Sequence, residues 1–72
     1  EQVAAELARH RAQHEETLAT YRSLEALLEE LPPARRERYR YPRQTLRMGI
    51  HYEQAWLAWC DEAVRELELP PV

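Results

Sequence analysis

The sequence predicts an all-α fold, a two-helix antiparallel hairpin with helices at about 2–30 and 42–68. Three observations predict it. Helix-forming residues run without glycine or proline through the first segment. Apolar residues recur at helical spacing through the second segment. A proline pair follows each segment, and proline ends a helix because it lacks the amide proton. Two such helices with a short connection fold back most simply as a hairpin.

The first helix carries two series of residues at helical spacing. Alanine repeats every seven residues from Ala5 to Ala26 on one face. These alanines have two interpretations, which are close approach of another helix or simple helix propensity on an exposed face. The other face is a near-heptad apolar seam suited to packing along a helix. The seam contains Val3, Leu7, His14, Leu18, Tyr21 and Leu28, with Leu24 and Leu31 at its edge.

The segment from Pro32 to Tyr41 is expected to turn the chain. Pro42 is expected near the first position of the second helix, where its missing donor costs nothing. Arg43 and Arg47 would then lie near the positive end of the helix dipole, which is unfavourable for a cation. This arrangement predicts acidic groups beside the start of the second helix.

The connector is basic although the net charge of the chain is −3. Residues 32–47 hold six arginines and one acid, and both flanking segments are acidic. In one interpretation the basic residues of 35–47 contact phosphate or DNA. In the other, which we favour, their arginines neutralise neighbouring acidic helices, because an arginine cluster alone is not specific. The overall acidity gives no support to a DNA-reading surface spread over the whole chain.

The second helix is apolar over more than half of its circumference, which is wider than a surface helix of a monomer needs. Its apolar residues form two stripes along the helix, and we expect each stripe to be covered by a different neighbour. The first stripe should pack against the first helix of the same chain. The second stripe, with Gly49, Tyr52, Trp56 and Trp59, should face a second subunit. The first stripe is Leu46, Ile50, Leu57, Cys60, Val64 and Leu67, and the second is Gly49, Tyr52, Trp56, Trp59 and Ala63.

The length of 72 residues favours a homodimer. A chain this short builds only a marginal core, and a single cysteine excludes an intrachain disulfide. Two hairpins with twofold symmetry would complete a four-helix or coiled-coil-like arrangement. The predicted core or dimer interface is Leu18, Tyr21, Leu28, Leu46, Gly49, Ile50, Tyr52, Trp56, Leu57, Trp59 and Val64.

Glu53 projects into the apolar stripe of the second helix, and burial of an unpaired carboxylate is costly. It therefore needs a partner. Glu53 and His14 are candidates for a buried polar pair that fixes the helix register, and contact of this carboxylate with an effector is the alternative. The possible partners in the first helix are His10, Arg11, His14 and Tyr21.

The aromatic residues of the second helix also have two interpretations. Tyr52, Trp56 and Trp59, with Met48 on the same side, could line a wall for a flat ligand. Spacings of three and four residues are equally typical of a buried helix face, and we favour the core or dimer interface.

Metal binding and catalysis are not expected. His10 and His14 share one helical face, but the sequence has neither a Cys-x-x-Cys nor a His-Glu-x-x-His pattern. Hydrogen-bonded histidines are therefore favoured over metal ligands, with no cofactor. Cys60 stands among apolar residues, which favours a small core residue over a nucleophile. No catalytic triad, phosphate loop or carboxylate pair is recognisable, so we do not expect an enzyme.

The cellular location expected from the sequence is the cytoplasm. A lone cysteine is compatible with a reducing compartment. The chain has no leader pattern and no apolar run of the roughly 20 residues that a membrane span needs.

The segment 41–59 resembles the C-terminal domain of PadR-like transcriptional regulators, also described as the virulence-activator alpha C-terminal domain. That family has a long helix, a proline-containing break and a second helix with a Leu-x-x-Gly-Ile-x-Tyr-Glu-x-x-x-x-Trp-like core. The residues that stand in for this core are Leu46, Gly49, Ile50, Tyr52, Glu53, Leu57 and Trp59, with Trp59 one residue beyond the tryptophan position of the pattern.

The resemblance implies that residues 1–72 form a single C-terminal domain that dimerises and in some relatives senses a small aromatic effector. A winged-helix DNA-binding domain would precede Glu1, and DNA would be a partner only through that domain. Two alternatives from other classes stay open: a module that senses a small hydrophobic ligand, and a plain coiled-coil scaffold. The target promoter and the sign of regulation are not encoded in these features.

Overall fold

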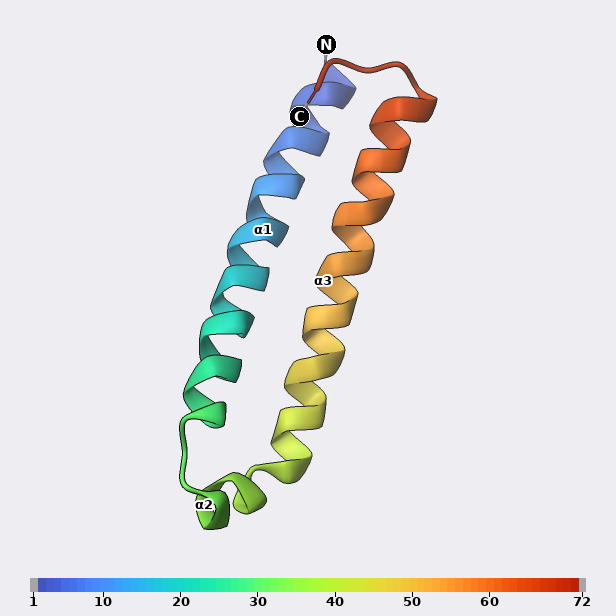
Figure 1. Cartoon of the computed structure of the whole chain (residues 1–72). Coiled ribbons are helices and arrows are strands. Elements are labelled where there is room, and N and C mark those ends of the chain that lie inside the picture. Colours follow the sequence, from blue (N-terminus) through green and yellow to red (C-terminus); the bar gives the residue numbers. More distant parts are fainter. Residues whose placement is uncertain (1, 72) are drawn as a thin grey trace.

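The computed structural model describes residues 2–71 and is a hairpin of two long helices joined by a short helical corner (Figure 1). Helix α1 spans Gln2–Glu29, α2 spans Pro33–Arg38 and α3 spans Arg40–Glu66. α1 and α3 lie side by side and antiparallel, in a molecule of 52 × 16 × 12 Å. The predicted all-helical hairpin is confirmed, and α1 ends within one residue of its predicted end.

The chain turns between the long helices as expected, but part of this connector forms α2, a short helix that was not predicted. Pro33 takes the first position of α2, where a missing amide proton costs nothing. The amide of Arg36 then donates to the carbonyl of Pro32 at 3.0 Å. α3 also begins earlier than expected, at Arg40, so Pro42 lies within its first turn rather than at its start. Since amides of a first turn have no intrahelical acceptor, the helix tolerates Pro42 there.

The C-terminal end of α3 is closed by hydrogen bonds to its last turn. Glu68 has a φ of 53°, the left-handed conformation that glycine usually adopts after a helix. Its amide donates to the carbonyl of Arg65 at 3.2 Å, and the amide of Leu69 donates to Val64 at 3.0 Å. These two bonds form a Schellman motif. The helix therefore ends at Glu66, two residues before the predicted end, and Leu67 is exposed rather than part of the apolar stripe.

The core between α1 and α3 is small. Among residues 2–71, only Ala4, Ile50, Cys60 and Glu53 are buried. Most residues predicted to pack between the two helices are only half-buried, because a two-helix hairpin has no third element to cover them. These half-buried residues are Leu7, Leu18, Tyr21, Leu28, Leu46, Leu57 and Val64.

Cys60 provides a test of this core. Burial raises the pKa of the Cys60 thiol, and the thiolate is the nucleophilic form. We expect a thiol reagent at neutral pH to label the folded protein at least about tenfold more slowly than the denatured protein. Labelling followed by mass spectrometry measures both rates. Equal rates would contradict a buried Cys60.

Candidate functional site

A polar pair lies in the middle of the helix contact. Nδ1 of His14 in α1 is within hydrogen-bond distance of Oε2 of Glu53 in α3. A carboxylate only accepts hydrogen bonds, so the imidazole donates through its Nδ1–H. Glu53 is 5% exposed, and its carboxylate is therefore almost removed from water. Of the four partners considered for Glu53, the structure places His14 beside it.

Trp56 packs against the same histidine. The two rings are stacked, with centroids 4.0 Å apart and planes 21° apart. Trp56 also meets the edge of Trp59 at 5.7 Å, and the ring of His10 lies 6.3 Å away. The ring of Trp56 therefore stacks on His14, the partner of Glu53, within its own chain.

Gly49 of α3 lies against the aromatic ring of Tyr21 in α1. A methyl group at Gly49 would meet Cε2 of Tyr21 at 2.8 Å and Cδ2 at 3.2 Å. Because Gly49 has no side chain, the ring of Tyr21 can lie close to the backbone of α3. The space beside Gly49 is therefore occupied by Tyr21 of α1 in the same chain.

One side of the hairpin is a surface that we call the aromatic face, formed by Leu24, Leu27, Met48, Tyr52 and Trp59. Their exposed fractions are 46%, 60%, 68%, 61% and 52%, respectively. At about 100° per residue, the two leucines of α1 and the three residues of α3 fall on the same side of the interhelical contact. Tyr52 and Trp59 thus remain available for the second subunit that the sequence predicts.

The other side is a surface that we call the ion-paired face, formed by Arg11, Glu25, Arg43, Arg47 and Asp61. Nε and Nη2 of Arg11 donate to the two carboxylate oxygens of Asp61 at 3.1 and 3.4 Å. Nη1 of Arg47 lies 2.6 Å from Oε2 of Glu25, and Nη2 of Arg43 lies 3.9 Å from the same oxygen. The predicted acidic group beside the start of the second helix is therefore present, as Glu25.

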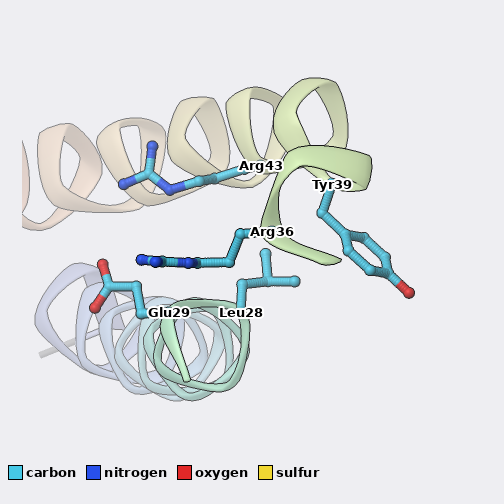
Figure 2. A pocket seen from close by; sticks show the side chains of 5 residues that line it. All are labelled: Leu28, Glu29, Arg36, Tyr39 and Arg43. Carbon is cyan, nitrogen blue, oxygen red and sulfur yellow. The ribbon is translucent and has the colours of Figure 1, made fainter. Parts of the chain in front are cut away.

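Hollows lie on both sides of the corner. The hollow on the ion-paired face has a volume of about 510 Å³, with two arginines and a glutamate around it (Figure 2). A second hollow of about 400 Å³ lies on the aromatic face and is mainly apolar. Leu28 and Tyr39 separate the two. The first hollow is lined by Leu28, Glu29, Arg36, Tyr39 and Arg43, and the second by Leu24, Leu27, Leu28, Leu31, Tyr39, Pro42 and Leu46.

The other predicted features are placed as follows. The alanines at 5, 12, 19 and 26 are exposed, so a close approach of another helix would have to come from outside the chain. No group of three or more metal-binding side chains occurs among the described residues. None of the helices within residues 2–71 has the length and apolar character needed to cross a membrane.

Sequence reasoning missed the cross-helix ion pair of Arg11 with Asp61 and the exposed position of Leu27. Both could have been found. Once an antiparallel register is assumed, Arg11 and Asp61 fall opposite each other as complementary charges, and Leu27 falls beside Leu24 outside the seam. Arg36 could not have been found as a hollow-lining residue, because its position depends on α2.

The fold and the two faces define a small all-helical hairpin domain with one ionic side and one apolar side. The family model described as virulence activator alpha C-terminal matches residues 1–68. The chain belongs to this family, which indicates a domain of a transcription regulator. Neither a comparison with curated proteins nor one with solved structures found a match.

Proposed function

We propose that this chain is the homodimerising C-terminal domain of a PadR-like DNA-binding regulator, and that the aromatic face is buried between two copies. The observation that carries the proposal is the concentration of large apolar side chains on one side of the hairpin. Leu24, Leu27, Met48, Tyr52 and Trp59 are all about half exposed or more. Exposed apolar side chains gathered on one side of a small protein mark an interaction site.

The area of the hairpin supports a second copy as the occupant. The accessible surface is 5555 Å², whereas a compact monomer of this size exposes roughly 4,700 Å². The difference of about 850 Å² is close to the roughly 800 Å² that each partner contributes to a standard interface. The radius of gyration, 15.9 Å, likewise exceeds the roughly 11 Å of a compact domain of this length.

The chemistry of the aromatic face fits a twofold interface. Tryptophan, tyrosine and methionine are enriched at the centres of protein interfaces, and charged residues are depleted there. The interhelical ion pairs of Arg11 and Glu25 lie on the opposite side, so they would stay in water after dimerisation. In a twofold interface the same patch serves both copies, and four helices then enclose the apolar residues.

Within this proposal, DNA is read by a winged-helix domain that precedes the hairpin, and the hairpin sets the spacing between two such domains. The protein acts in the cytoplasm, where its DNA target is accessible. The hairpin has no catalytic role and needs no cofactor. The resemblance to PadR-like regulators and the match to the virulence activator family support this assignment.

The oligomeric state tests the proposal. We expect the protein to sediment as a dimer and the double variant Tyr52→Ser/Trp59→Ser to sediment as a monomer at micromolar concentration, because each dimer loses four large apolar side chains from its interface. The matched control is Glu62→Ser/Arg65→Ser, two exposed residues of α3 whose replacement leaves the net charge unchanged. A monomeric parent protein, or an equal effect of both double variants, would contradict the proposal.

Sensing of a small apolar ligand is the second candidate, and the apolar hollow of about 400 Å³ on the aromatic face favours it. The same double variant separates the two candidates. Tyr52 and Trp59 do not line this hollow. A sensor that works without a second copy would therefore keep its ligand in the double variant, whereas the dimerisation domain would lose its partner.

A further inference from the structure

The charged hollow at the corner of the hairpin is not used by the proposed dimer. It lies on the ion-paired face, with Glu29 from α1, Arg36 from α2 and Arg43 from α3 around it (Figure 2). Its volume of about 510 Å³ is within the usual range for small-molecule sites. Because the aromatic face lies on the other side, a second copy there would leave this hollow open to water.

The two arginines of this hollow have hydrogen-bond donors to spare. A guanidinium has five N–H donors. Within residues 2–71, Arg36 has neither an ion pair nor a side-chain hydrogen bond. The contact of Arg43 with Glu25, at 3.9 Å, is too long for a hydrogen bond, and Arg47 occupies the same carboxylate at 2.6 Å. Both guanidinium groups can therefore bind an oxyanion.

The backbone holds the lining residues at fixed spacing. The amide of Tyr39 donates to the carbonyl of Arg36 at 3.0 Å, and the amide of Arg43 donates to the carbonyl of Tyr39 at 2.8 Å. The amide of Arg36 is itself bonded to Pro32 at 3.0 Å. Three residues of the hollow are thus linked in series by main-chain hydrogen bonds, which lowers the ordering cost of bringing the two arginines together.

The hollow has two chemically different ends. Figure 2 shows the guanidinium groups of Arg36 and Arg43 pointing to one end, with the Glu29 carboxylate, whereas Leu28 and the ring of Tyr39 form the other. Glu29 reduces the local positive charge, so a bare anion gains little there. A ligand that also places carbon against Leu28 and Tyr39 gains from burial of apolar area.

We propose that this hollow binds the phosphate group of a small organic phosphomonoester. The phosphate oxygens accept hydrogen bonds from Arg36 and Arg43, since guanidinium forks match phosphate geometry. The organic part of the ligand lies against Leu28 and Tyr39. Glu29 weakens the binding of any anion here, and the apolar contact favours the organic phosphate over inorganic phosphate.

A small molecule fits better than the DNA backbone. The corner lies at one end of the 52 Å hairpin, and the start of α1 lies at the other (Figure 1). If a DNA-binding domain precedes α1, as in the proposed function, its DNA lies far from the corner. Only this preference for a small molecule over DNA rests on the proposed function. The contacts of Arg36 and Arg43 are independent of it.

Titration with phenyl phosphate, followed by NMR of the backbone amides and arginine Nε–H groups, tests the site. We expect saturable shifts at Arg36, Tyr39 and Arg43, and at least about threefold weaker binding of inorganic phosphate. Arg36→Gln is expected to weaken the binding of phenyl phosphate about tenfold, because the substitution removes a charge-assisted hydrogen bond. Glu29→Gln is expected to strengthen binding of both anions, about threefold, because it removes a repulsive charge.

The matched control is Arg38→Gln, which removes the same charge from α2 at a residue that does not line this hollow. It should change the affinity less than about twofold. Equal losses in Arg36→Gln and Arg38→Gln would overturn the proposal, because they would indicate a diffuse basic surface. Absence of saturation by phenyl phosphate would also overturn it, as would a short DNA duplex that shifts the same residues at lower concentration.

Discussion

Replacing His14 by alanine is expected to reduce the free energy of unfolding by about 3 kcal/mol, because the Glu53 carboxylate then stays buried without its partner. Glu53 is only 5% exposed, but the His14 side chain is 21% exposed, so the pair is not fully buried. The expected cost therefore lies at the lower end of the range for breaking a buried ion pair. The variant also loses the stacking of His14 on Trp56. Urea denaturation followed by circular dichroism measures the change at fixed protein concentration.

Two further variants identify the cause of this loss. Gln13→Ala, at an exposed neighbouring position of α1, should change stability by less than about 0.5 kcal/mol. Glu53→Leu in the His14→Ala background should recover part of the loss, because both polar partners are then replaced by apolar groups. If His14→Ala cost no more than Gln13→Ala, the buried polar pair would not contribute to stability.

Replacing Gly49 by leucine is expected to cost about 3 kcal/mol through overpacking. The Cβ alone would lie 2.8 Å from Cε2 of Tyr21, and the longer side chain would force the ring away from α3. Leucine has a better helix propensity than glycine by about 0.8 kcal/mol, which offsets only part of this cost. Thermal unfolding measures the outcome, with Ala58→Leu at an exposed position of α3 as the control.

We assign this loss of stability to overlap with the ring of Tyr21. Removal of the ring should therefore suppress most of the loss. In a Tyr21→Ala background, Gly49→Leu should cost less than about 1 kcal/mol, because the leucine can fill the vacated space. A loss that persisted without the Tyr21 ring would exclude this explanation.

The long helices could be predicted from the sequence because their signals are local. The proline pairs, the run of helix formers in α1 and the spacing of apolar residues in α3 define α1 within one residue and α3 within two. The short helix α2 could not be predicted in the same way, because six residues give too few positions for a periodic pattern. Pro33 followed by alanine and arginine permits a helix, but the same residues are also compatible with a turn.

The sequence indicated which residues form the site, but not which neighbour each of them contacts. The need of Glu53 for a partner follows from its place in an apolar stripe. The choice of His14 among four candidates depends on the axial register of α1 against α3, which the sequence pattern left open. Gly49 and Trp56 also contact α1 of the same chain, which was not predicted, for a related reason. Both lie at the margin between two stripes, where a small rotation of α3 decides which neighbour they meet.

The cross-helix contacts also determine how the two helices can change during evolution. In an antiparallel pair, opposite residues have numbers with a constant sum, and the Arg11–Asp61 and Glu25–Arg47 pairs share the same sum. The Tyr21–Gly49 contact falls within two residues of it. An insertion or deletion between residues 11 and 25 of α1 would therefore leave one ion pair in place and move the other out of reach. Changes of length between these contacts are therefore tolerated only if both helices change together.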